Sequence, residues 1–197
     1  MATLPFCNKR IAIALAVSVL AIGCVGVSTN NKVPTPQTPA TEDTWIKGPV
    51  IIPPITVYDL EGVKHSFPEE FKDSRTLLLL AFKHEQQELL NPWLRATTKL
   101  TETTKGFKVI EMPTIERSSA AFRAMVNNGM RSGIDDETAR RRTMTLYVNK
   151  REFLDTLGIK DETKVYALLV DSSGKVVWRY DGNYSPEALA SLVKVLD

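Results

Sequence analysis

The pattern of apolar and polar residues from about residue 48 onward divides the chain into short segments of two kinds. Continuous or alternating apolar runs are typical of strands, whereas apolar residues three or four positions apart are typical of helices. By this rule, strands are predicted at 55–60, 76–82, 107–115, 143–148, 165–170 and 175–180. Helices are predicted after residue 82 as far as about 100, at 118–128, at 150–157 and from 186 to the end of the chain. Strands and helices that alternate in this way indicate an α/β domain.

Two local features complicate the helical segments. Pro92 lies within the first predicted helix, so it either kinks that helix or marks its first turn with Asn91 as the cap. The segment 127–134 contains Gly129 and Gly133 and is interpreted as a flexible loop. Its glycines do not have the spacing of phosphate-binding loops.

The succession of predicted elements resembles that of thioredoxins. A strand comes first, a βαβ unit with a following helix comes next, then an extra strand and helix, and a β-hairpin with a final helix comes last. The resemblance implies a thioredoxin-like α/β fold over residues 48–197, with a central mixed sheet flanked by helices. A domain of about 150 residues is large enough to bury a substantial core.

The N-terminal segment has the features of an export signal. Lys9 and Arg10 precede an uninterrupted apolar run at 11–23. At 1.5 Å per residue this run would span roughly 20 Å, short of the ~30 Å hydrocarbon core of a bilayer. This length is typical of a secretory signal peptide.

The apolar run ends in Leu-Ala-Ile-Gly-Cys, which resembles a bacterial lipobox with Cys24 as the lipidated residue. Residues 1–24 are therefore interpreted as the signal peptide and lipobox of a membrane-anchored lipoprotein in the bacterial cell envelope, facing the periplasm. Ordinary cleavage after Gly23, which would give a secreted protein, remains open. An uncleaved anchor or an organelle-targeted, mitochondrial protein also remains open.

The segment 25–47 is rich in Thr, Asn, Pro and Ser and is predicted to be an extended tether. The chain has 25 Lys and Arg and 23 Asp and Glu. Two of these basic residues, Lys9 and Arg10, belong to the leader, so the rest of the chain carries no net charge. This balance argues against general nucleic-acid binding.

Both cysteines of the chain, Cys7 and Cys24, lie in the leader. In a thioredoxin a C-x-x-C motif follows the first central strand, and the matching place here is 83–86, Lys-His-Glu-Gln. The resemblance also implies a proline before the hairpin, but 161–164 contains none. Since the thiolate is the nucleophile in disulfide chemistry, no thiol oxidoreductase activity is expected from the folded domain. A binding module is expected instead.

Two segments are the candidates for contact with a partner protein, which the sequence does not identify. They are the loop Lys83, His84, Glu85 and Gln86, and the basic residues Arg131, Arg140, Arg141 and Arg142. The arginines could bind acidic lipid headgroups or an acidic protein. They could equally form a solvated loop balanced by the acidic residues at 135–137.

The alternative is an enzyme that does not use a thiol. His84 could act as the general base of a hydrolase, or could bind a metal together with Glu85 and Glu88. No G-x-S-x-G motif supports a hydrolase. No other catalytic residue, resident metal or cofactor is predicted.

From about residue 57 the chain also resembles the Atp10 family, mitochondrial assembly factors for the membrane sector of ATP synthase. The residues that carry this resemblance are Ala81–His84, Trp93, Arg131–Ile134, Arg141–Tyr147, Phe153 and the segment 169–182 with Asp171, Gly174, Trp178 and Gly182. The resemblance implies a thioredoxin-like fold and a chaperone or assembly role toward a hydrophobic subunit of a membrane complex. The leader departs from a mitochondrial presequence, which should be Arg- and Ser-rich and amphipathic.

Overall fold

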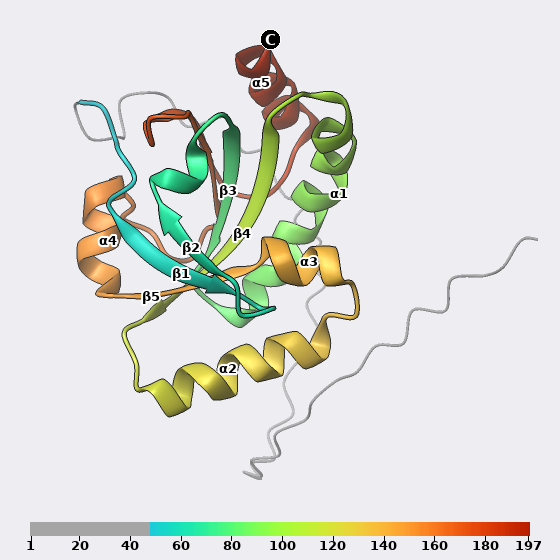
Figure 1. Ribbon diagram of the computed structural model, residues 1–197. Helices are drawn as coiled ribbons and strands as arrows, with labels where there is room; N and C mark the ends of the chain where they lie inside the picture. The colour runs from blue at the N-terminus through green and yellow to red at the C-terminus, as the bar shows by residue number, and fades with distance from the viewer. Residues whose placement is uncertain (1–47) are drawn as a thin grey trace, which may run out of the picture. The chain divides into compact units, whose positions relative to one another are not determined.

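Residues 48–197, the part of the chain that the computed structural model describes, build one mixed sheet with helices on both faces (Figure 1). The strands are β1 (Ile55–Asp59), β2 (Lys64–Phe67), β3 (Arg75–Ala81), β4 (Phe107–Glu116), β5 (Met144–Val148), β6 (Tyr166–Val170) and β7 (Val176–Asp181). The helices are α1 (Gln87–Thr103), α2 (Ala120–Gly133), α3 (Glu137–Arg142), α4 (Lys150–Leu157) and α5 (Pro186–Leu196), with the 3₁₀ turns η2 (Glu69–Phe71) and η3 (His84–Gln86). The predicted signal peptide with Cys24 and the tether 25–47 lie outside the described residues.

The seven strands lie in the order β2-β1-β5-β4-β3-β6-β7. The central strands β3, β4 and β5 are parallel, whereas β6, β7, β1 and β2 pair antiparallel to their neighbours. Parallel neighbours need crossover connections, and α1 supplies the one between β3 and β4. The predicted α/β class with a central mixed sheet is confirmed.

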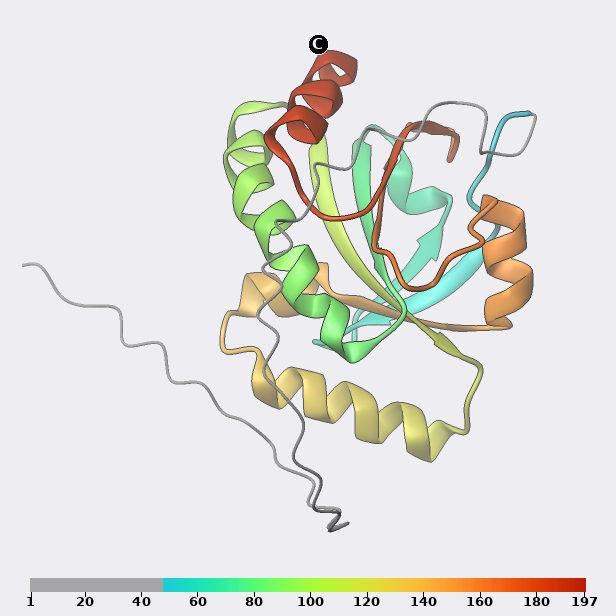
Figure 2. The ribbon, with the colours of Figure 1, turned by 180° about the vertical axis from the view of Figure 1, so that it is seen from behind.

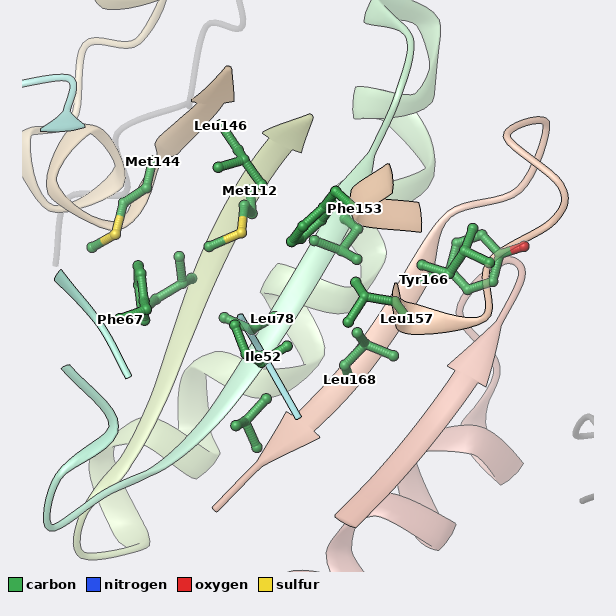
Figure 3. Packing of buried hydrophobic residues seen from close by; sticks show 14 of the residues in the cluster. Ile52, Phe67, Leu78, Met112, Met144, Leu146, Phe153, Leu157, Tyr166 and Leu168 are labelled. Carbon is green, nitrogen blue, oxygen red and sulfur yellow. The ribbon is translucent and has the colours of Figure 1, made fainter. Parts of the chain in front are cut away.

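Each face of the sheet carries its own apolar core. On one face α4, the segment 50–52 and Phe71 cover side chains such as Leu78, Met112 and Leu168 (Figure 3). On the other face α1 and α5 cover Leu77, Leu79 and Leu169 (Figures 1 and 2). The apolar run of β3 is buried throughout because its successive side chains point alternately into the two cores.

Two details of the secondary structure outside the region between β4 and β5 differ from the sequence-based expectations. The edge strand β2 was not predicted, because its sequence KHSF contains one apolar residue and shows no clear alternation. The first helix begins at Gln87 with Pro92 inside it, so Asn91 is not its cap. Within residues 48–197, no helix combines the length and apolar character needed to span a bilayer.

The region between β4 and β5 differs most. The segment 127–134 is helical rather than a loop, since α2 continues through Gly129 to Gly133. A further helix, α3, follows where a solvated loop had been considered. Asp136 caps α3 by accepting hydrogen bonds from the backbone N–H groups of Thr138 and Ala139, and its last turn carries three arginines. An acidic cap and basic last residues both suit the helix dipole.

Candidate functional site

The loop at residues 83–86 lies where β3 leaves the sheet and α1 begins. Lys83 has extended backbone, and residues 84–86 form the turn η3, which leads directly into α1. β6 runs antiparallel to β3, with Leu80 opposite Tyr166. The segment 161–164, just before β6, is therefore brought to the same end of the sheet.

Gln86 joins these two segments. Its side-chain oxygen accepts hydrogen bonds from the backbone N–H groups of Phe82 (2.6 Å) and Lys83 (3.1 Å). Its side-chain nitrogen donates to the backbone oxygens of Glu162 (2.8 Å) and Lys164 (3.2 Å). The residue is only 3% exposed, and both of its amide N–H groups are used. Gln86, one of the predicted partner-binding residues, thus holds the site together from inside.

The other three residues of the loop face solvent. Lys83, His84 and Glu85 are all exposed. The side chain of His84 has no hydrogen bond or ion pair with any residue from 48 to 197. A general base is normally held in one orientation by a second group. The part of the chain that the structure describes supplies no such group for His84.

Facing this loop, the segment 161–164 is held by its own polar contacts. Two hydrogen bonds from Thr163, from its hydroxyl and its backbone N–H, lower the pKa of Asp161. Tyr166 donates its hydroxyl to the backbone oxygen of Asp161 at 2.9 Å, and burial raises the pKa of this tyrosine to about 12. The ammonium group of Lys164 lies 2.7 Å from the carboxylate of Asp181. The segment is therefore a fixed rim of the site.

A buried carboxylate on β4 connects this loop with the basic segment. The side chain of Glu111 is 5% exposed and accepts a hydrogen bond from Gln87, at the start of α1, at 2.8 Å. Its other oxygen accepts from the Nε of Arg142 on α3 at 2.9 Å. The start of α1, which directly follows the loop 83–86, is thus joined to Arg142 of the basic segment through one side chain. The sequence analysis missed Glu111, although a single acid in the apolar strand FKVIEMPTI was a usable signal.

A second acid that the sequence analysis missed, Glu61, pairs with two more arginines. It accepts a hydrogen bond from the Nε of Arg140 and lies 3.1 Å from Arg131. The bond from Arg140 lowers the pKa of Glu61 despite the opposing effect of desolvation. Arg140 also donates to the backbone oxygens of Ile134 and Asp135, both at 2.9 Å. Arg140 is therefore an internal tie between α3 and the turn after β1.

Of the four predicted basic residues, two remain on the surface. The side chains of Arg131 and Arg141 are 54% and 55% exposed, and Arg141 pairs with Glu137 one turn earlier in α3. Of the acidic residues 135–137 that the solvated-loop alternative named, Glu137 pairs with Arg141, whereas Glu61 and Glu111 pair with the other three arginines.

The described residues offer no metal site. They contain no group of three or more His, Cys, Asp and Glu that could hold a metal ion, and His84 with Glu85 and Glu88 does not form one. The other histidine, His65 on β2, lies between the carboxylates of Asp59 (3.3 Å) and Glu70 (3.1 Å). The fold does not bring the two histidines into one group.

No protein-family model matches the sequence, and no curated protein matches it. Solved structures of thioredoxin-like proteins do match. The exposed lipoprotein thioredoxin of Streptococcus pneumoniae is 15% identical with a TM-score of 0.50, covering 73% of this chain and 99% of that one. A DsbF homologue from Corynebacterium diphtheriae is 11% identical with a TM-score of 0.53, covering 83% and 96%.

BsSco, a member of the Sco family of cytochrome c oxidase assembly proteins, is 18% identical with a TM-score of 0.50, covering 77% of this chain and 97% of that one. At these identities the similarity shows the fold alone. The domain has a thioredoxin-like fold, and its solved neighbours include thiol–disulfide oxidoreductases.

Proposed function

We propose that this protein is a membrane-tethered, thioredoxin-like binding module that assembles or chaperones a partner protein without thiol chemistry. The observation that carries the proposal is the position of Gln86 and its hydrogen bonds. This residue stands at the second cysteine position of a C-x-x-C motif, is 3% exposed, and bridges two loops through four hydrogen bonds. Lys83 stands at the first position, and no cysteine follows Cys24. A nucleophilic thiolate is therefore lacking where such domains would need it.

The surface proposed to contact the partner consists of Lys83, His84 and Glu85, together with Arg141 on α3. These side chains are exposed, whereas Gln86, Arg140 and Arg142 are engaged with the body of the domain. The hydrogen-bonded loops hold these exposed charged side chains in place. This arrangement suits recognition, because little conformational freedom of the backbone is lost on binding. The mixed charges favour a protein partner over nucleic acid.

Two structural neighbours and the family resemblance support the proposed location and role. The proposed location is the bacterial cell envelope, with Cys24 lipidated and residues 25–47 as the tether. One structural neighbour is described as an exposed lipoprotein and another as a member of a family of assembly proteins. The resemblance to the Atp10 family agrees with an assembly role, and its implied kind of partner is a membrane protein complex.

The proposal is tested by capture from intact membranes. A photo-crosslinking residue in place of His84 is expected to link one defined partner. Lys83→Glu is expected to reduce this capture by about tenfold or more, because it reverses a charge within the proposed interface. Lys105→Glu is the matched control, since Lys105 is an exposed lysine beyond the far end of α1. Equal capture by both variants would reject this surface.

Two further measurements address the chemistry and the anchor. Wild-type protein is expected to catalyse disulfide reduction no faster than the uncatalysed reaction, and a clear rate enhancement would refute the thiol-free part of the proposal. Mass spectrometry of the mature N-terminus is expected to show an acylated Cys24. An unmodified N-terminus beginning elsewhere would refute lipidation.

A further inference from the structure

The helix α2 is the least integrated element of the described domain. None of its residues is buried. Its large apolar side chains include Phe122, 43% exposed, and Met125, which at 63% is the most exposed large apolar side chain in residues 48–197. In both views α2 lies along one margin of the domain, apart from α1 and α4 (Figures 1 and 2). Its outer surface therefore contributes little to the core.

One side of α2 fastens it to the sheet through polar contacts. Tyr147 on β5 donates its hydroxyl to the side-chain oxygen of Asn127 at 2.8 Å, and its ring lies 6.0 Å from the guanidinium of Arg123. Thr145 contacts the sulfur of Met130 at 3.5 Å. At 3.6 residues per turn, Met125 lies about 200° around the helix from Arg123. Met125 thus lies on the side away from the sheet, and Phe122, about 100° around the helix from Arg123, lies at the edge of that side.

The charge around this apolar side has one sign. From residue 117 to residue 134 the chain contains Arg117, Arg123 and Arg131 and no acidic residue. All three arginines are exposed. Arg131 is paired with Glu61, and Glu116 and Asp135 border the stretch on either side. An amphipathic helix with aromatic and aliphatic residues on one side and arginines on the opposite, polar side is typical of segments that lie in a membrane interface.

We infer that α2 rests on an anionic bilayer surface, with Phe122 and Met125 inserted among the headgroups and the arginines bound to lipid phosphates. The inference rests on the proposed membrane tether. By its composition, the segment 25–47 would reach between about 25 Å as a coil and about 70 Å fully extended. Such a tether keeps the domain close to the membrane, so a weak contact is sufficient to dock it.

The size of the exposed side favours lipid over a protein partner. A helix of 14 residues is about 21 Å long and about 10 Å wide, so its outer side offers roughly 200 Å². A stable protein interface buries about 800 Å² per partner, several times more. Shallow insertion of two apolar side chains, assisted by about 1 kcal/mol per arginine near an anionic surface, needs no larger area.

The test uses the full-length protein with two kinds of vesicle, phosphatidylcholine alone and phosphatidylcholine mixed with phosphatidylglycerol. Flotation reports attachment, and hydrogen exchange of the α2 amides reports docking. Exchange of α2 is expected to slow on the anionic vesicles only. Because 1 kcal/mol is a factor of about five, Arg117→Gln should reduce this protection by roughly fivefold.

Matched variants separate docking from folding. The double variant Phe122→Ser, Met125→Ser should lose the protection, whereas Val177→Ser, at an exposed valine on β7, should retain it. Arg117 precedes the helix, so Arg117→Gln tests the charge without changing α2 itself.

The outcomes distinguish this inference from the tether. Flotation on both vesicles with no change in α2 exchange would support the anchor and overturn the inference. Flotation on anionic vesicles only, dependent on Phe122 and Met125, would support the inference and refute the anchor. Protection that follows protein density rather than lipid charge would show that a second copy covers α2, and would overturn the inference. Flotation on neither vesicle would refute both.

Discussion

The helices α1 and α2 carry apolar residues at similar spacing, but the fold uses them differently. In α1 the side chains of Leu90, Trp93 and Leu94 are buried against the sheet, and Trp93 is 0% exposed. In α2 the corresponding stripe of Phe122, Met125 and their neighbours stays on the surface. Both helices lie in crossovers between parallel strands, so their positions in the topology are equivalent.

The difference arises from what else each crossover contains. Between β3 and β4, α1 is the only helix longer than one 3₁₀ turn, and it covers the sheet directly. Between β4 and β5 the chain forms both α2 and α3. The shorter α3 packs against the sheet through the buried Ala139 and the pair of Arg142 with Glu111. Because α3 covers this part of the sheet, α2 lies at the margin of the domain. Its apolar stripe is therefore available for a contact outside the domain.

The largest difference in stability between the two helices is expected when an aromatic residue of each apolar stripe is truncated. Trp93→Ala is expected to lower the free energy of unfolding by about 3–5 kcal/mol, because it removes a fully buried large side chain. Phe122→Ala in α2 is expected to change it by less than about 0.5 kcal/mol, since the ring is exposed. Denaturant unfolding of the two variants measures both values. Similar losses would show that α2 belongs to the core after all.

A smaller effect is expected where α3 packs against the sheet. Arg142→Ala should cost about 2–3 kcal/mol of unfolding free energy, because it leaves the carboxylate of Glu111 buried without its charged partner. Arg141→Ala is the control, since its pair with Glu137 is exposed and screened by solvent, so its loss should leave the free energy of unfolding nearly unchanged. If adding Glu111→Gln to Arg142→Ala recovers none of the loss, the pair is not the source of the effect.

At the start of α1, Gln86→Ala should cost about 1–2 kcal/mol, because two backbone N–H groups and two backbone oxygens lose their partner. The neighbouring Glu85→Ala should have little effect on stability, since Glu85 is exposed. Thermal unfolding measures both. Partner capture should weaken in Gln86→Ala even below its melting temperature, because the loop 83–86 is no longer tied to 161–164. Unchanged capture would show that this tie does not shape the site.

The smallest effect is a gain in stability in α2. A Cβ at Gly129 would meet nothing within 4 Å, and this residue is helical. Gly129→Ala should therefore stabilise the protein by about 0.5–1 kcal/mol if α2 unfolds with the rest of the domain. Hydrogen exchange of α2 shows whether the gain is local. A loss of stability would indicate that this side of α2 is already covered.

For the site, the sequence located the loop 83–86 because that loop directly follows an apolar strand. It also identified the basic residues, but it did not show which of them are free. Arg140 and Arg142 are bound by Glu61 and Glu111, which lie far from them in the chain. Pairing across such distances in sequence leaves no local signal, so the exposed part of the site emerged only from the structure.

The sequence by itself determined the α/β class, six of the seven strands and the thioredoxin-like order of elements, because apolar periodicity and helix caps are local properties of the chain. It also determined that no cysteine follows Cys24. Only the tertiary structure decided which amphipathic helix is buried, which arginines are internal and that Gln86 joins two loops. Those outcomes depend on which segments, far apart in sequence, pack against the same part of the sheet or pair with one another. A local pattern of residues contains no information about such contacts.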